Sequence, residues 1–426
     1  MRFWGITGTN GKTTTTWITA EFINAAKDRK CGYVTTVEVN TGARQFYTGY
    51  TTPPLAQLKE IFAEMEANGC TDCVMEVSSH AIHQHRTGDT VFSGGVFTNL
   101  SEDHLDYHKT MEAYFDVKLD FARQIAAAHP TTPDMGRRDL PPYVVCLDGG
   151  YGREMFNAVG NLAVNVIPVS SRSRESKSNS GVLASSCKPK EQDGKFHSST
   201  STPNFDLSGL QLVGDYNKSN VLCAAALAEA AGVEHETIQA VIPTLKPRWG
   251  RLEEVKVKGD GGGPRVFVDF AHTPDGLEKV LTAVRAEMLR TSSPSPVTFT
   301  SSRLWVVFGA GGDRDPMKRP LMGEACAKLA DRLVVTSDNP RSEDPLKIID
   351  AIVEGVKSVD RSTFNLQPST FLFVEPDRAK AIALALSRAD EKDVVIIAGK
   401  GHETTQEIKG VKYPFDDREI VRAFAG

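Results

Sequence analysis

Short apolar runs alternate with longer stretches of helical character along this chain. Residues 1–26 have the pattern of a strand, a Gly-rich turn and a helix, and residues 73–77 and 95–98 are apolar runs that end in polar residues. Strands that alternate with helices predict a parallel sheet covered by helices. Ligands of such sheets bind beyond the carboxyl ends of the strands.

The same pattern starts again in the second half of the chain. A helical stretch at 217–231 ends before Gly232, and apolar runs follow at 266–270, 304–308, 333–336 and 394–398. We therefore predict two α/β domains, over residues 1–242 and 243–426. Residues 169–203 interrupt the first domain with a Ser- and Lys-rich segment that has few large apolar side chains. Such a segment cannot offset its ordering entropy, so we predict a disordered surface insertion there.

Composition narrows the class of protein. The formal net charge of −5 and the isoelectric point near 6.1 give no reason to expect a nucleic-acid partner. We see no apolar run near the roughly 20 residues that span a bilayer and no targeting segment, so we expect a cytoplasmic protein with no membrane partner. The seven cysteines lack framework spacing, which fits a reducing compartment. Cys70 and Cys73 form a lone C-x-x-C that is better explained by strand cysteines than by a zinc site.

A candidate phosphate loop, GTNGKTT, joins the first strand to the first helix. Glycines let backbone N–H groups approach phosphate, and a helix N-terminus adds partial positive charge. The strict G-x-x-x-x-G-K-[ST] pattern is broken by one place, because Ile6 stands where its first glycine belongs. A purely structural turn is the alternative. The candidate nucleotide-binding residues are Gly8, Thr9, Asn10, Gly11, Lys12, Thr13 and Thr14.

Acidic and histidine residues follow the next two strands, in MEVSSHAIHQHR (75–86) and FTNLSEDHLDYHKTMEAY (97–114). Glu76 and His104 are placed to complete a Mg²⁺ shell together with the Thr13 hydroxyl. For the other histidines, surface or hydrogen-bonded roles compete with a zinc site. A zinc site would leave the phosphate loop unexplained.

These motifs resemble the Mur ligases and their relatives, the folylpolyglutamate synthases, over most of the chain. The resemblance implies an α/β fold with a central P-loop-type ATPase domain and a C-terminal Rossmann-like domain. It also implies an ATP-dependent amide ligase that activates a carboxylate as an acyl phosphate. It assigns ATP phosphates to Asn99, and Mg²⁺ to Thr13, Glu76, His104 and Lys118. In this family the lysine matching Lys118 carries a carbamate; without the resemblance it would be an ordinary helix lysine.

The resemblance is strongest to the family members that add meso-diaminopimelate. It implies nucleotide contacts at Arg251, Asp269 and His272. It implies contacts with a UDP-muramoyl-dipeptide at Thr51, Thr52, Ser78, Gln84 and Arg86. It implies diaminopimelate contacts at Arg314, Asp338, Asn339, Arg341, Gly399 and Glu403. Arg341, within the stretch DNPR, would pair with the second carboxylate of diaminopimelate, because a guanidinium binds a carboxylate through two parallel bonds.

The sequence therefore predicts catalytic roles for Lys12, Lys118, His104 and Glu76 in peptidoglycan precursor synthesis. One rival is a folylpolyglutamate synthase-like ligase, against which DNPR argues. The other is a non-catalytic scaffold related to these ligases, against which the complete catalytic set argues. Mur ligases usually begin with a UDP-binding domain, whereas the phosphate-loop strand here starts at Met1. A separate N-terminal UDP-binding domain is therefore an expected partner.

Overall fold

The computed structural model describes the chain except for residues 133, 172–203, 258–262, 292–301, 360–370 and 425–426. The chain divides into two compact units, Met1–Leu245 and Lys246–Gly426. Nearly all of the predicted insertion lies outside the described residues. Among the helices that are described, none combines the length and the apolar character needed to cross a membrane.

An eight-stranded sheet forms the centre of the first unit, in the order β4-β3-β2-β5-β1-β6-β7-β8. The strands from β2 to β8 in this order pair in parallel, and β3 and β4 add an antiparallel edge. The strands are β1 (Arg2–Thr7), β2 (Cys31–Val34), β3 (Val39–Asn40), β4 (Gln45–Phe46), β5 (Asp72–Glu76), β6 (Phe92–Phe97), β7 (Pro142–Cys146) and β8 (Asn165–Val169).

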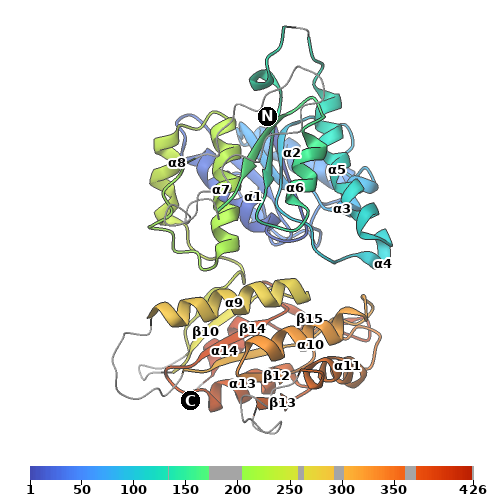
Figure 1. The fold of residues 1–426 in the computed structure, drawn as a ribbon, viewed down its shortest axis with the longest axis vertical. Coiled ribbons are helices and arrows are strands. Elements are labelled where there is room, and N and C mark those ends of the chain that lie inside the picture. The colour runs from blue at the N-terminus through green and yellow to red at the C-terminus, as the bar shows by residue number, and fades with distance from the viewer. Residues whose placement is uncertain (133, 172–203, 258–262, 292–301, 360–370, 425–426) are drawn as a thin grey trace, which may run out of the picture. The chain divides into compact units, whose positions relative to one another are not determined.

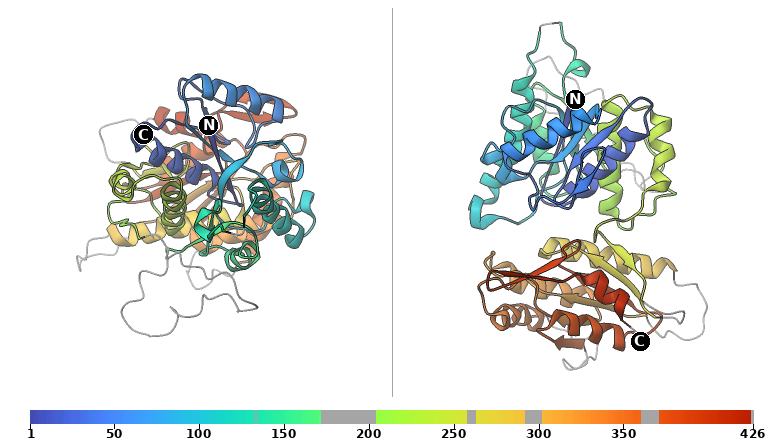
Figure 2. Two further views of the ribbon diagram at one scale, coloured as in Figure 1. Left: turned by 90° about the horizontal axis from the view of Figure 1, so that it is seen from above. Right: turned by 180° about the vertical axis from the view of Figure 1, so that it is seen from behind.

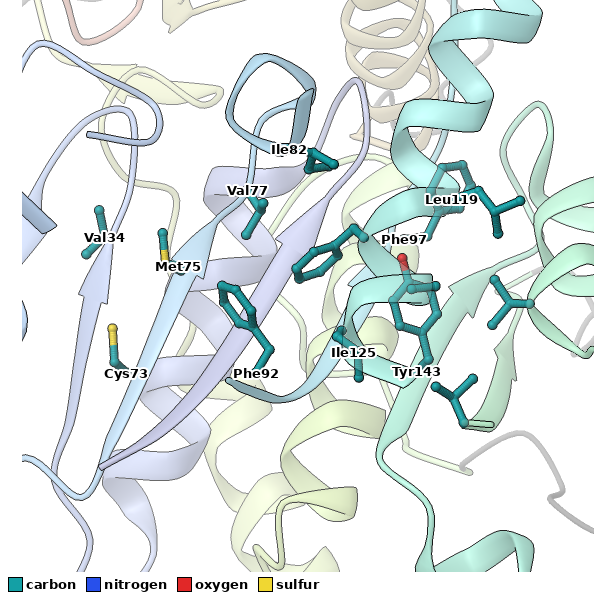
Figure 3. Packing of buried hydrophobic residues seen from close by; sticks show 14 of the residues in the cluster. Val34, Cys73, Met75, Val77, Ile82, Phe92, Phe97, Leu119, Ile125 and Tyr143 are labelled. Atoms are coloured by element: carbon teal, nitrogen blue, oxygen red, sulfur yellow. The ribbon is translucent and has the colours of Figure 1, made fainter. Parts of the chain in front are cut away.

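Helices cover both faces of this sheet (Figures 1 and 2). The helices are α1 (Lys12–Ala25), α2 (Leu55–Ala67), α3 (Ser79–His83), α4 (Leu105–His108), α5 (Met111–Ala128), α6 (Gly152–Val159), α7 (Asp215–Ala230) and α8 (His235–Val241), with short 3-10 turns η1 (Arg137–Asp139) and η3 (Ile242–Thr244). Because side chains alternate along a strand, Cys73 and Met75 of β5 pack on one face with Ile125 of α5, whereas Val74 is buried on the other (Figure 3). This explains why β5 is apolar at consecutive positions.

A six-stranded sheet, in the order β13-β12-β11-β14-β10-β9, forms the centre of the second unit. All its pairs are parallel except β9 with β10, and a separate antiparallel hairpin is formed by β15 and β16. The strands are β9 (Glu253–Val255), β10 (Arg265–Asp269), β11 (Leu304–Phe308), β12 (Arg332–Val335), β13 (Leu372–Val374), β14 (Val394–Ala398), β15 (Thr405–Ile408) and β16 (Val411–Pro414). The helices are α9 (Pro274–Thr291), α10 (Lys318–Leu329), α11 (Pro345–Lys357), α13 (Arg378–Arg388) and α14 (Asp417–Ala423).

The predicted fold class is confirmed: both units are α/β with largely parallel sheets. The predicted strands at 304–308 and 394–398 coincide with β11 and β14. The strand predicted at 95–98 begins three residues earlier, at Phe92, where Gly94 and Gly95 had hidden the apolar pattern. The helix predicted at 217–231 starts at Asp215.

Candidate active site

The phosphate-loop candidate lies where β1 meets α1, at the carboxyl end of a strand that has β5 and β6 on either side. Gly8 and Gly11 have φ angles of 146° and 83°, which favour glycine. A Cβ on Gly8 would lie 1.9 Å from Thr98 Oγ1, and one on Gly11 would lie 2.4 Å from Asn220 Oδ1. Gly5, one place before the position where the strict motif has its first glycine, lies inside β1, where a Cβ would meet Phe121 of α5 at 2.2 Å. Gly5 therefore serves helix packing, and Gly8 and Gly11 shape the loop.

The segment after β6 holds the loop in place. The Thr9 amide donates to the Asn99 carbonyl at 2.9 Å, and the Asn10 amide donates to Asn99 Oδ1 at 3.0 Å. Asn99 Nδ2 and Thr98 Oγ1 both donate to the Asn10 carbonyl, at 3.0 and 2.7 Å. Asn99, expected to contact ATP phosphates, thus also sets the conformation of the loop.

Two lysines converge on the Gly8 carbonyl oxygen. Lys12 Nζ donates to it at 2.9 Å and to the Thr9 carbonyl at 2.8 Å, and Lys118 Nζ of α5 donates to it at 2.9 Å. Lys118 is 1% exposed. Burial, reinforced by the charge of Lys12, lowers the pKa of Lys118 well below its ordinary value. This lysine can therefore be a neutral amine, which is the form that reacts with CO₂.

Glu76 lies at the end of β5, next to the β1 strand that leads into the loop. Its carboxylate is buried and accepts from the Thr36 amide at 2.8 Å and from Thr36 Oγ1 at 3.1 Å. These bonds fix the carboxylate without a cationic partner among the described residues. Glu76 is therefore oriented and available to a cation.

His104 follows β6 and has a left-handed backbone, with φ of 55°. Partial burial, reinforced by the positive charge of Lys12, lowers its pKa to about 4 against the opposing effect of Asp103. The imidazole is therefore neutral at pH 7 and has a lone pair to offer a metal.

The side chains beside the loop offer few ligands for Mg²⁺. No group of three or more His, Cys, Asp or Glu side chains among the described residues could hold a metal by itself. Mg²⁺ is ordinarily bound through one or two carboxylates, with phosphate oxygens and water completing its shell. One buried carboxylate, one neutral imidazole and the Thr13 hydroxyl beside a phosphate loop fit that pattern.

Several residues that lie near the loop were not among the site residues predicted from the sequence. Tyr114 of α5 is buried, its hydroxyl lies 3.2 Å from Thr9 Oγ1, and its ring lies 4.8 Å from Lys118 Nζ. The His108 ring stacks on Tyr114 at 4.8 Å, and its Nε2 lies 2.9 Å from Ser79 Oγ. Tyr114 ends the stretch 97–114 that was quoted for its acidic and histidine residues, but alternation and spacing carry no signal for its contact with the loop.

The predicted muramoyl-peptide contacts gather around Thr52 in the first unit. Thr52 Oγ1 donates to the Glu76 carbonyl at 2.9 Å and accepts from the Ser78 amide at 3.0 Å. Arg86 donates to the Thr52 carbonyl at 3.3 Å and to Gln84 Oε1 at 2.8 Å. Thr51 accepts from Thr36 Oγ1 at 3.0 Å. The five residues therefore form one connected set beside Glu76.

The predicted nucleotide contacts of the second unit surround Phe270. The Arg251 guanidinium lies 4.7 Å from the Phe270 ring, and the His272 and His402 rings lie at 4.7 and 4.8 Å. The adjacent Asp269 accepts from the amides of Leu252 and Ala271, both at 2.7 Å. Burial raises the pKa of Asp269 despite these bonds and the nearby Arg251.

Arg341 is fixed by the β15–β16 hairpin and by the turn after β11. Its backbone has φ of 50°, and its amide donates to the Glu407 carbonyl at 3.1 Å. Its Nη1 donates to the Gly312 carbonyl at 2.6 Å. A Cβ placed on Gly311 would lie 2.9 Å from Arg341 Nη1 and 3.7 Å from Arg314 Cγ. The structure thus brings the Arg314 and Arg341 side chains together beside Gly311.

The other predicted amino-acid contacts lie at the ends of β12 and β14. Asn339 Nδ2 donates to Glu403 Oε2 at 2.8 Å. A Cβ on Gly399, whose φ is 119°, would lie 2.5 Å from Asp338 Oδ2. The Gly399 amide donates to the Asp269 carbonyl at 3.1 Å, so the nucleotide and amino-acid sets meet at this point.

A glycine loop at the end of a central parallel strand, with converging lysines and a carboxylate, defines a nucleotide-using enzyme of the P-loop class. Comparison with known proteins gives the family. Residues 6–228 match the Mur ligase middle domain, and residues 250–401 match the domain described as "Mur ligase, glutamate ligase domain". The chain belongs to the Mur ligase family.

Named relatives cover nearly the whole chain. A UDP-N-acetylmuramoyl-L-alanyl-D-glutamate–2,6-diaminopimelate ligase from Synechococcus elongatus is 38% identical over 99% of this chain and 76% of its own length. The ligase of the same name from Geobacillus kaustophilus is 37% identical over 98% of this chain and 78% of its own length. A solved structure of a ligase with this name has a TM-score of 0.56 and 29% identity, covering 99% of this chain and 77% of that one.

Proposed function

We propose that this protein is an ATP-dependent amide ligase that joins meso-diaminopimelate to UDP-N-acetylmuramoyl-L-Ala-D-Glu in peptidoglycan precursor synthesis. The observation that carries the proposal is the 38% identity over 99% of the chain to a ligase named for this reaction. The connected set of Asp338, Asn339, Arg341, Gly399 and Glu403 supports the choice of amino acid. A cytoplasmic location is part of the same proposal.

ATP, bound with Mg²⁺, supplies the phosphoryl group that turns the D-glutamyl γ-carboxylate into an acyl phosphate open to attack by an amine. The amides of the Gly8–Gly11 turn and the Lys12 ammonium bind phosphate oxygens and offset their charge. Thr13, Glu76 and His104 hold the metal. Glu76 is kept in place by Thr36. His104 is neutral, so it does not need to lose a proton first.

Lys118 acts as a carbamate in this proposal. A buried ammonium beside Lys12 would repel a metal, whereas addition of CO₂ converts the position into a carboxylate ligand. The low pKa of Lys118 supports the assignment, because only the neutral amine reacts with CO₂. The short distance to the Gly8 carbonyl keeps its Nζ beside the loop.

The second unit binds the incoming amino acid. Arg341 pairs with the distal carboxylate of diaminopimelate, and the Arg314 side chain lies with it beside Gly311. Arg251, Asp269 and His272 contact the nucleotide. Thr51, Thr52, Ser78, Gln84 and Arg86 of the first unit bind the muramoyl dipeptide, beside the Glu76 strand end.

The same residues argue against two alternative functions. A folylpolyglutamate synthase-like ligase would use glutamate and has no need of the DNPR turn that fixes Arg341. A non-catalytic scaffold would not need Lys118 to be buried against the loop. Both alternatives give a distinct result in the assay below.

The test measures ADP release by the 426-residue chain with UDP-muramoyl-dipeptide and either meso-diaminopimelate or L-lysine. The relatives extend beyond the matched region, so a Mur ligase N-terminal domain is added in trans in parallel. ADP release that requires both the dipeptide and diaminopimelate supports the proposal. Glutamate-dependent release with a folate acceptor supports the first alternative, and absence of turnover with and without the added domain supports the scaffold.

A further inference from the structure

A fully buried lysine stands in the middle of the amino-acid contacts. Lys400, in the turn after β14, has 0% side-chain exposure. Its Nζ donates to Asn339 Oδ1 at 3.1 Å and to Glu403 Oε2 at 2.8 Å. Asn339 Nδ2 donates to the same Oε2 at 2.8 Å. We call these three side chains, Lys400, Asn339 and Glu403, the Asn339 cluster.

The bonds of this cluster leave little freedom. Asn339 Oδ1 accepts from Lys400 and, at 2.9 Å, from the Glu407 amide, so the amide group of Asn339 can face only one way. Its Nδ2 must then point at Glu403. Glu403 Oε2 accepts hydrogen bonds from both Asn339 Nδ2 and Lys400 Nζ, so the carboxylate cannot rotate freely.

One oxygen of this carboxylate is left for a ligand. Among the described residues, Glu403 Oε1 has no hydrogen-bond partner, and the Glu403 side chain is 30% exposed. The nearby Asp338 side chain, on the residue before Asn339, likewise accepts no hydrogen bond from any described residue. The backbone of Glu407 bonds to both Asn339 and Arg341, so these carboxylates and Arg341 belong to one connected site. Such a site suits an ammonium and a carboxylate carried on one carbon atom.

We propose that Lys400 is a positioning residue for amino-acid selection: it holds Glu403 Oε2 and Asn339 so that Glu403 Oε1 faces the distal ammonium of the incoming amino acid. The inference rests on the proposed function, since it takes diaminopimelate as the ligand. Arg341 recognises the distal carboxylate, and the Asn339 cluster recognises the ammonium beside it. Lys400 itself does not touch the ligand.

The test compares two amino acids that differ only in that ammonium. meso-Diaminopimelate has it, and 2-aminopimelate keeps the reacting amine and the distal carboxylate but lacks it. Lys400→Met should raise KM for diaminopimelate about tenfold, the loss of one charge-assisted contact. KM for 2-aminopimelate and for ATP should change by less than about twofold. A role in general stability would raise KM for both amino acids equally.

Controls separate the outcomes. Lys412→Met, on the exposed β16 strand, should leave all three KM values unchanged. If Lys400→Met does not fold, Lys400→Gln keeps an amide donor for Glu403 and carries the same prediction with a smaller shift. Equal effects on both amino acids, or none on either, overturn the inference while the proposed function stands. A wild-type chain that ligates neither amino acid, even with the added N-terminal domain, overturns the proposed function and the inference with it.

Discussion

Replacement of Arg341 should weaken the use of diaminopimelate and spare that of lysine. Removing one partner of a buried charge pair costs about 2–5 kcal/mol. The Arg341 side chain is 22% exposed, so we expect the low end, about 2 kcal/mol, which is roughly a 30-fold loss of kcat/KM. Lysine has no distal carboxylate, so its low kcat/KM should stay within about twofold. Arg341→Met is preferred to Ala because it keeps the volume of the side chain beside Gly312.

The assay is ADP release at saturating ATP and muramoyl dipeptide, with either amino acid varied. Because Arg341 Nη1 also binds the Gly312 carbonyl, KM for ATP and the Tm of the variant must match the wild type before the loss is interpreted. Arg388→Met, on an exposed arginine at the end of α13, is the matched control. Equal turnover of diaminopimelate and lysine by the unmutated protein would refute the reasoning.

Three further predictions concern other parts of the chain. Lys118→Ala should lower phosphate release at least about 100-fold, and acetate should restore part of the lost activity. Full activity of this variant would show that the reaction needs no carbamate at Lys118. Gly8→Ala should weaken ATP binding at least tenfold in calorimetry, because its Cβ would lie 1.9 Å from Thr98 Oγ1, whereas Gly263→Ala meets no atom within 4 Å and should bind normally. Burial lowers the pKa of His402 to about 3, so below pH 6.5 the unfolded state binds the proton first and stability falls. In urea unfolding, wild type should lose about 2 kcal/mol more than His402→Gln between pH 7 and 5; equal losses would contradict this.

The elements that could be predicted from the sequence share one property: their signal is local. The strand-turn-helix at the phosphate loop and the strands β11 and β14 each show their pattern within a few residues. Gly94 and Gly95 hid the start of β6. Gly94 packs against Pro142 and Trp4, and Gly95 packs against Tyr143 and α5, and no local pattern records this packing.

The contacts that complete the sites could not be predicted, because they join distant parts of the chain. Thr36 orients Glu76 across 40 positions, and Tyr114 reaches Thr9 across 105. Lys400 bonds to Asn339 across 61 positions. In the sequence Lys400 is one charged residue in a glycine turn. It gains its partners only because the carboxyl ends of β12 and β14 lie at the same edge of the folded sheet.

In the proposed reaction, a carboxylate is activated by phosphoryl transfer and then captured by an amine on this chain. The most direct measurement uses UDP-muramoyl-dipeptide labelled with ¹⁸O in the D-glutamyl γ-carboxylate, with ATP and meso-diaminopimelate. Mass spectrometry should find one ¹⁸O in the released inorganic phosphate for each tripeptide formed, because the carboxylate oxygen leaves with the phosphoryl group. Unlabelled phosphate alongside the tripeptide product, or ¹⁸O in AMP, would contradict the claim.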